Sequence, residues 1–458
     1  MSAENAKPKR SAASRLVEDA SSTLVTRILG MAIGLFTGII TARWLGPESR
    51  GIFSLVVLFP STLVTLTKFG QSQASIYFIR RQKIDPSRVA SNVATFAVGV
   101  GVVAIGVVVL AREWLVATVL NGVPVWALLC IVPLIPVLLL ESYLYGVLQA
   151  TDRFRTYNLR IIGDNVMTLL SMAVALVVLD LGLVGALGVV IAVRAVMILW
   201  VLRTVNIETP LRPAFDRGLF RQMIRYGLKS HVQIIASHFH VRAAMYLVAY
   251  YLDPAQVAFY SIGARLAERI LYVPQSLGLA LFPRLASADV ERVHSMTATA
   301  VRQTLVMTVS LAAFVTVVGP WAIVIAYGDA YAAAAVPLRI VCWGIVMMSM
   351  YVLLSRNFTS RDRQQINIIA AYLALGGNLL LNVYLVPRYG IAGSAWATTC
   401  SYSVAALVLL AFFLRESGLP LRQVLLIQPS DLALWRRLAG EGLSQLRAGR
   451  ASGPPAPR

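Results

Sequence analysis

The residues best placed to do chemistry are charged side chains inside otherwise apolar stretches. Arg242, Arg265 and Arg269 each lie roughly eight to thirteen residues inside such a stretch, and Arg27 lies nearer the start of the first one. A charge at mid-bilayer costs about 2.5–3.5 kcal/mol on insertion scales, so these side chains should face water, a partner or a ligand. Because the guanidinium group is permanently charged and forked, the four arginines predict binding of an anionic group.

Helical spacing places other polar residues beside these arginines. His238 and Arg242 are one turn apart, as are Arg265 and Arg269, with Glu268 on the same face as the latter pair. Glu268 could simply neutralise one arginine, but the remaining arginines would still be uncompensated. The predicted substrate-binding residues are Arg27, His238, Arg242, Arg265, Glu268 and Arg269.

Two further acids also fall inside apolar stretches. Glu141 and Asp164 are candidate ion-coupling residues, although Asp164 follows Arg160 by one helical turn and we favour a structural ion pair there. The three cysteines lie in apolar runs without metal-ligand spacing, so neither a metal nor a cofactor is predicted. Nucleotide-binding, metalloprotease and nucleophile motifs are also missing, so no enzymatic activity is predicted.

Long apolar helices must position these residues. Of 458 residues, 58% are hydrophobic and 14% charged, against a usual charged share of about 25% in globular domains. Apolar runs long enough to cross a bilayer recur along the chain, which excludes a soluble fold. We predict an all-α integral membrane protein with about 12 transmembrane helices. The expected spans are 21–43, 52–78, 91–111, 123–148, 158–179, 182–203, 228–251, 258–282, 303–326, 332–355, 366–387 and 391–414.

Lysine and arginine are divided unevenly among the connections. The termini and even-numbered connections hold 30 of the 41, whereas the odd-numbered connections hold four: Arg43, Arg50, Arg112 and Arg388. Because translocated loops are depleted in positive charge, both termini are predicted to be cytoplasmic. The same asymmetry explains most of the net charge of +20, so no nucleic-acid partner is predicted.

Short matches at a nearly constant displacement indicate an internal repeat. In order, 45–47 matches 252–254, 152–153 matches 362–363, and 182–185 matches 390–393, at displacements of 207, 210 and 208 residues. The repeat predicts two six-helix lobes of the same orientation with a central cavity. The expected organisation is an N-terminal cytoplasmic segment (1–20), an N-lobe (21–205), a cytoplasmic linker (206–227), a C-lobe (228–415) and a partly disordered cytoplasmic tail (416–458).

Several of these segments resemble a known family. The resembling residues are 42–47 (Ala-Arg-Trp-Leu-Gly-Pro) with Gly51 and Ser54, 259–261 (Phe-Tyr-Ser) and 281–285 (Leu-Phe-Pro-Arg-Leu). Over residues 20–415 the chain resembles the polysaccharide-exporting flippases, the Wzx-like branch of the multidrug/oligosaccharidyl-lipid/polysaccharide exporter superfamily. The resemblance implies a cationic cavity between two lobes. It also implies export of a polyprenyl-pyrophosphate-linked oligosaccharide across the bacterial inner membrane.

The expected partners follow from that resemblance: a lipid-linked glycan, membrane lipids, and a polymerase or glycosyltransferase of the same pathway. Two alternatives stay open. An ion-coupled multidrug antiporter would be expected to bind a cationic drug with acidic side chains. Glu141 and Asp164 are acids inside apolar stretches and are compatible with this alternative. A scaffold that organises a glycan assembly complex without transporting anything is the other. Lipid II flippases typically have fourteen helices, which disfavours that substrate for a chain with twelve.

Overall fold

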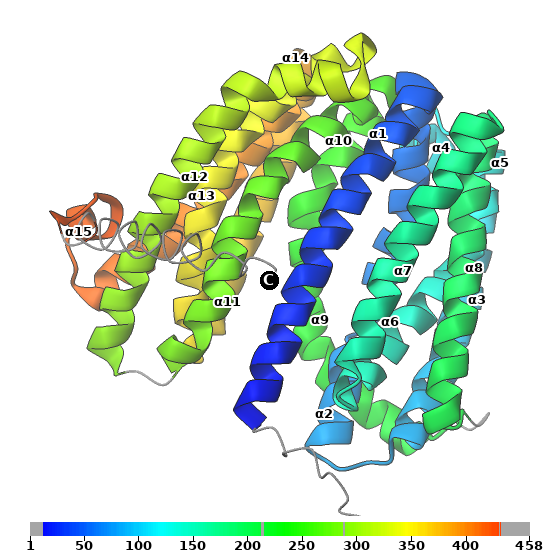
Figure 1. Cartoon of the computed structure of the whole chain (residues 1–458), viewed down its shortest axis with the longest axis horizontal. Helices are drawn as coiled ribbons and strands as arrows, with labels where there is room; N and C mark the ends of the chain where they lie inside the picture. Colours follow the sequence, from blue (N-terminus) through cyan, green and yellow to red (C-terminus); the bar gives the residue numbers. More distant parts are fainter. Residues whose placement is uncertain (1–11, 212–214, 287–288, 430, 432–458) are drawn as a thin grey trace, which may run out of the picture. The chain divides into compact units, whose positions relative to one another are not determined.

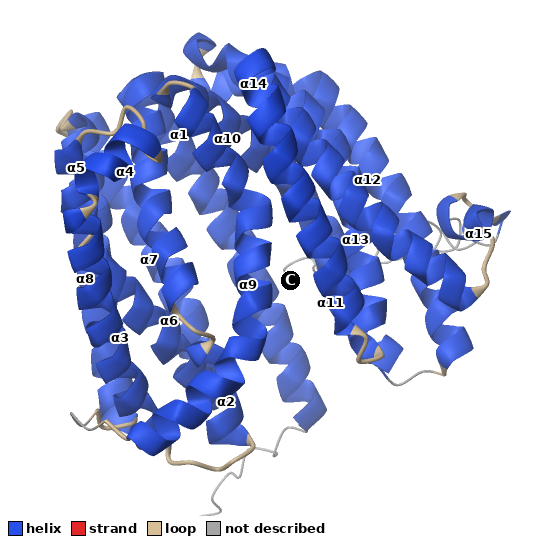
Figure 2. Ribbon diagram, turned by 180° about the vertical axis from the view of Figure 1, so that it is seen from behind, coloured by secondary structure: helices blue, strands red, loops and turns tan. Residues whose placement is uncertain are grey.

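The computed structural model describes residues 12–211, 215–286, 289–429 and 431, and every regular element in this part is a helix (Figures 1 and 2). Within the described residues, eight helical stretches are long and apolar enough to cross a membrane, so this is a multi-pass membrane protein. The helices are α1 (Ala12–Thr67), α2 (Gln71–Arg80), α3 (Pro86–Leu110), α4 (Arg112–Thr118), α5 (Val125–Ile131), α6 (Leu134–Ala150), α7 (Phe154–Met172), the π-helix η1 (Ala173–Val178), α8 (Gly182–Glu208), α9 (Arg217–Tyr251), α10 (Pro254–Glu268), the 3-10 turn η2 (Arg269–Leu271), α11 (Tyr272–Ala286), α12 (Val290–Tyr327), the 3-10 helix η3 (Asp329–Ala334), α13 (Ala335–Ser360), α14 (Gln364–Ser417) and α15 (Leu421–Leu425).

Two of the eight stretches each contain two crossings, because a glycine bends the chain in the middle. α1 turns at Gly46 (φ 71°, ψ 170°) and α14 at Gly390 (φ 56°, ψ −138°), conformations that glycine adopts without steric cost. α9 and the stretch formed by α10, η2 and α11 are further long helices, which carry more charged residues and lie at two of the remaining predicted spans. The predicted fold class, with about 12 crossings, is confirmed.

The internal repeat is visible in the backbone. Asp152 (φ 59°) and Asp362 (φ 58°) are both left-handed, and they lie 210 residues apart. Gly182 and Gly390, which are 208 residues apart, both have φ of 56°. Few non-glycine residues adopt positive φ, and aspartate is among those that do so most readily. Two of the three matched segments therefore form turns with matching φ, whereas the third pairs Gly46 (φ 71°) with Asp253, whose φ is not positive.

Local signals set the helix ends. Asp85 caps α3 by accepting a hydrogen bond from the Ser87 amide at 3.3 Å, and Pro86 occupies the first helical turn. At the other end of the chain, α14 stops at Gly418, whose φ of 65° suits a left-handed cap. These caps satisfy amides and carbonyls that would otherwise lack partners at membrane boundaries.

Packing divides the chain into two compact units. Unit 1 comprises Met1–Ser261, Trp321–Ala335 and Val386–Ser394, and unit 2 comprises Ile262–Pro320, Val336–Leu385 and Ala395–Arg458. Within unit 1, α7 lies beside the first half of α1 (Figures 1 and 2). The predicted lobes, 21–205 and 228–415, were derived from the internal repeat and the loop charges, not from packing. Their boundaries therefore stay a prediction.

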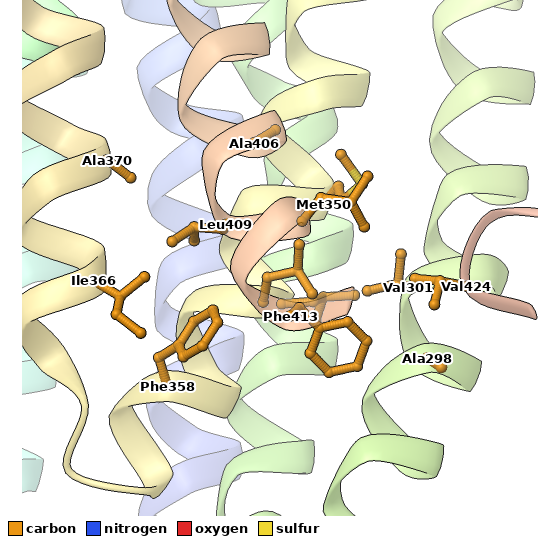
Figure 3. Packing of buried hydrophobic residues seen from close by; sticks show 13 residues of the cluster. Ala298, Val301, Met350, Phe358, Ile366, Ala370, Ala406, Leu409, Phe413 and Val424 are labelled. Carbon is orange, nitrogen blue, oxygen red and sulfur yellow. The ribbon is translucent and has the colours of Figure 1, made fainter. Parts of the chain in front are cut away.

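Unit 2 has an apolar core built from α12, α13, α14 and α15 (Figure 3). Phe358 of α13 and Phe413 of α14 are fully buried there, and Val424 of α15 joins them. Arg302 of α12 holds α15 and the segment after it, because it donates to the Gln423 carbonyl in α15 and its Nε donates to Asp431 Oδ2 at 2.7 Å. The first part of the predicted tail is therefore packed onto this unit, and the rest of it, from residue 432, lies outside the described residues.

Candidate functional site

In unit 1 the polar stripe of α9 faces the second half of α1. A hydrogen bond of 3.1 Å joins His231 Nε2 to the Leu66 carbonyl, and one of 2.9 Å joins His238 Nε2 to Thr62 Oγ1. Tyr246 donates its hydroxyl proton to the same Thr62 oxygen at 2.7 Å. His231, His238 and Tyr246 therefore lie along the face of α9 that meets the second half of α1.

This face is basic. Arg242 and Lys68 both lie close enough to His238 to act on its charge, and Lys68 also acts on His231. We call these four residues, Lys68, His231, His238 and Arg242, the α9 basic cluster. Lys68, His238 and Arg242 are half-buried, and His231 is buried. The cluster therefore concentrates positive charge within helices of membrane length.

A break between α1 and α2 brings Lys68 to the cluster. Phe69 (φ 43°) and Gly70 (φ 66°) have left-handed backbone conformations, which end the helix after Thr67. A Cβ on Gly70 would lie 2.2 Å from the Gly227 carbonyl oxygen, and one on Gly227 would lie 2.3 Å from the Phe69 carbonyl oxygen. Only glycine allows backbones to approach so closely, so this pair fixes the break against α9.

A second basic region lies in unit 2, where the chain changes from α10 to α11. Arg265 lies in α10, Glu268 is the last residue of that helix, and Arg269 is the first residue of the 3-10 turn η2. The Arg265 side chain is exposed, whereas those of Glu268 and Arg269 are half-buried. The predicted helix over 258–282 therefore changes from α to 3-10 geometry at the predicted site residues, while the backbone stays right-handed on both sides. A short 3-10 stretch inside a helix often marks a functional hinge.

The two candidate ion-coupling acids lie in a different part of unit 1, among α6, α7 and α8. Glu141 Oε1 is 2.7 Å from Arg160 Nη2, and both side chains are almost fully buried. Arg194 bridges the two acids, with its Nη1 3.4 Å from Glu141 Oε2 and its Nη2 3.4 Å from Asp164 Oδ2. The Arg160 guanidinium also stacks 4.6 Å from the Tyr145 ring centroid. We call Glu141, Arg160, Asp164 and Arg194 the paired network; its formal charges cancel.

The paired network differs from the sequence-based interpretation in one respect. We predicted an ion pair between Asp164 and Arg160, one turn apart on α7. Asp164 instead contacts Arg194 of α8, and Arg160 contacts Glu141 of α6. Cross-helix pairs tie three helices together, which a pair within one helix could not do.

The predicted substrate-binding residues are thus placed as follows. His238 and Arg242 belong to the α9 basic cluster, and Arg265, Glu268 and Arg269 lie at the η2 turn. The side chain of Arg27, on α1, is outside the described residues. Their role in binding stays a prediction.

Sequence reasoning underrated three residues that accompany the cluster. From the sequence, Lys68 was as well explained by a side chain that extends to the membrane surface as by a role in binding. In the structure it lies close enough to His231 and His238 to act on the charge of both. Thr62 and Tyr246 carried no signal beyond being polar in an apolar helix. Among the described residues, no three His, Cys, Asp or Glu side chains come together in a way that could hold a metal ion.

One curated relative matches part of the chain. The curated relative "Probable low-salt glycan biosynthesis flippase Agl15" of Haloferax volcanii is 21% identical over 204 residues. The match covers 43% of each chain, so this chain spans less than half the length of that relative.

Two solved structures share the fold. The lipid II flippase MurJ in an inward closed conformation has a TM-score of 0.74 at 16% identity, and the match covers 89% of each chain. An inward-facing multidrug resistance MATE transporter of the MOP superfamily has a TM-score of 0.70 at 15% identity, covering 85% of this chain and 94% of that one.

The family assignment rests on a longer match. The model of a family described as "Polysaccharide biosynthesis protein" matches residues 40–336, well over half of the chain. That range contains both the α9 basic cluster and the η2 turn. The chain therefore belongs to the polysaccharide biosynthesis protein family and has the fold of the MurJ and MATE transporters.

Proposed function

We propose that this protein is a flippase that moves an anionic, polyprenyl-pyrophosphate-linked oligosaccharide from the cytoplasmic to the outer leaflet of the bacterial inner membrane. The observation that carries the proposal is the α9 basic cluster, a concentration of positive charge inside membrane-length helices. A cationic drug would be repelled there. Family membership and the glycan flippase among the relatives support the same substrate class.

In this proposal the pyrophosphate head contacts the arginines and lysine, while the polyprenyl tail stays in lipid. Arg242 offers a forked pair of donors, and Lys68 a compact charge. Arg265, Glu268 and Arg269 would also belong to this binding site. Arg27 would add a contact from the first half of α1.

The proposed topology keeps both termini in the cytoplasm, with the lobes at 21–205 and 228–415. Moving a head with about two negative charges outward is favoured by a negative interior, by roughly 2.3 kcal/mol per charge per 100 mV. The membrane potential could therefore drive export. Basic side chains would lower the cost of desolvating the head while the lobes expose it alternately to each leaflet.

Reconstitution tests the proposal. Purified protein is placed in liposomes with a fluorescent polyprenyl-pyrophosphate oligosaccharide on one leaflet, and an impermeant quencher reports its arrival on the other leaflet. We expect protein-dependent transfer that accelerates with an imposed potential. If the substrate stays in its original leaflet, the protein is a scaffold of a glycan assembly complex, and the transport proposal is wrong.

A further inference from the structure

Arg50 is a buried cation that the sequence analysis counted in an outer connection. It lies one turn after the Gly46 corner of α1 and is only 5% exposed. Its guanidinium carbon is 5.3 Å from the Phe53 ring centroid. Among the described residues the guanidinium has neither a hydrogen bond nor an ion pair, and its Nε is buried without a partner.

Other parts of unit 1 enclose this arginine. Tyr327 and Tyr331 lie close enough to act on its charge, and both are buried. The start of α10 packs directly on the next residue, since a Cβ on Gly51 would lie 1.7 Å from the Pro254 carbonyl oxygen. Arg50 is therefore shielded from solvent by the end of α12, by η3 and by α10.

Hydrogen bonds hold this cover in place. Tyr331 donates its hydroxyl proton to the Ala42 carbonyl at 2.7 Å, and Arg43 Nε donates to the Ala326 carbonyl at 2.7 Å. A second Arg43 nitrogen donates to the Ile325 carbonyl. We call the hydrogen bonds of Arg43 and Tyr331 the latch. Each is a side-chain contact that can break without unfolding a helix.

A permanently charged group in this position is costly unless something compensates it. Arginine does not give up its proton in proteins, and a desolvated charge without a partner is strongly disfavoured. An apolar side chain would pack in the same place at lower cost. The charge is therefore explained best by an anion that Arg50 contacts when the latch is open.

We propose that Arg50 is a second anion-binding residue, which takes the pyrophosphate head of the lipid-linked substrate after the latch opens. The inference rests on the proposed function and topology, in which Arg50 lies toward the outer leaflet. Arg50 and Thr62 are twelve residues apart on one helix, about 18 Å at the usual rise. The α9 basic cluster would hold the head first, and Arg50 would hold it before release.

Cysteine accessibility tests the latch. Cys130, Cys342 and Cys400 are replaced, Arg50→Cys is introduced, and an impermeant thiol reagent is applied on the outer side of proteoliposomes. We expect slow labelling that becomes roughly five-fold faster with Tyr331→Phe, the factor expected for one hydrogen bond. Equal, slow labelling in both proteins would mean that Arg50 is permanently buried and would overturn the proposal.

Transport tests the binding role. Arg50→Gln should cut export of the fluorescent lipid-linked oligosaccharide by about ten-fold or more while leaving the melting temperature unchanged or higher, because a buried charge is removed. Arg50→Lys should keep part of the activity. Arg112→Gln is the matched control, since that outer arginine pairs with Glu113 and is partly exposed.

The outcomes separate this inference from the proposed function. If wild-type protein moves no substrate, the proposed function fails; if wild type and Arg50→Gln export equally, only the inference fails. If Arg50→Gln loses stability and activity together, Arg50 is structural and the inference is wrong. Export is also measured with inorganic phosphate on the outer side. Dependence on that phosphate would assign Arg50 to a free anion instead of the head group and would overturn the proposal.

Discussion

Two regions of unit 1 place charge inside membrane helices in opposite ways. In the paired network, Glu141 and Asp164 are matched by Arg160 and Arg194, across three helices. In the α9 basic cluster, the groups that act on the charge of His238 are both basic. In the paired network the two negative and two positive formal charges cancel. In the α9 basic cluster the basic side chains lie close to one another.

The two arrangements predict different roles for the two regions. A buried pair contributes little net stability, but removing one member leaves the other uncompensated, so the pair fixes how its helices pack. Like charges held together raise the energy of the empty site, and an anion relieves that cost when it binds. We therefore expect mutations in the network to affect folding and mutations in the cluster to affect transport.

The largest expected effect is on stability, for Glu141→Ala. Glu141 and Arg160 side chains are only 4% and 5% exposed, so the variant leaves a buried guanidinium without its carboxylate. We expect a loss of about 3–5 kcal/mol in the free energy of unfolding, measured by denaturation in detergent.

A compensating variant controls for the lost volume. Glu141→Leu combined with Arg160→Met removes both charges, and it should recover most of the stability. A single Glu141→Ala protein as stable as wild type would show that the network does not hold the helices.

The next effect is on transport, for Arg242→Ala. Loss of charge-assisted hydrogen bonds to the head, worth about 1.5–3 kcal/mol, should lower export by roughly 10- to 100-fold with little change in melting temperature. Arg269→Ala should behave in the same way. Arg203→Ala, an exposed arginine on α8, is the control. Normal export from both Arg242→Ala and Arg269→Ala would remove the basis of the substrate assignment.

A smaller effect is expected for Asp164→Asn. Its pair with Arg194 is partly exposed, at 17% and 29%, and Arg194 keeps its contact with Glu141. We expect at most about 1 kcal/mol of destabilisation and near-normal export under an imposed potential without an ion gradient. Export that requires a proton or sodium gradient and disappears in Asp164→Asn would instead favour ion antiport.

The fold could be predicted from the sequence because membrane helices are specified locally. Apolar length and single glycines are enough to place a corner such as Gly390, and the observed α3 and α8 begin and end within a few residues of the expected spans. The position of the 3-10 turn at Arg269 could not be predicted, because neither glycine nor proline stands there; Pro274 comes only in the following turn.

The candidate site was less predictable, because it depends on tertiary packing. Spacing along α9 gave the face shared by His238 and Arg242, which is a property of one helix. It could not give the partner of Asp164, since an arginine on α8 competes with one on α7. Counting loop charges likewise placed Arg50 in a solvent-exposed connection, whereas residues from distant segments bury it.

The smallest expected effect is on stability and comes from an ion pair at the surface. This exposed pair is the reference against which the buried charges of the paired network and the α9 basic cluster can be compared. Asp216 caps α9 by accepting from the Leu219 amide at 3.0 Å, and its other oxygen accepts from Arg88 Nε at 2.9 Å. The hydrogen bond from the Leu219 amide has the larger effect and the one from Arg88 the smaller, and together they hold the pKa of Asp216 below its ordinary value of 3.8. The native state therefore favours the carboxylate, and the resulting stability is present above pH 3.8 and lost as the pH falls through the lowered native pKa.

Asp216→Asn keeps a capping oxygen but cannot titrate. The melting temperature of wild type should therefore exceed that of the variant slightly at pH 5, and the gap should narrow as the pH falls below 3.8 toward the lowered native pKa. Because the Arg88 side chain is 62% exposed, added salt should shrink the gap at pH 5, whereas the cost of Glu141→Ala should hardly change with salt. Equal salt sensitivity at both sites would mean that water reaches the paired network, and the contrast with the α9 basic cluster could then no longer be attributed to burial.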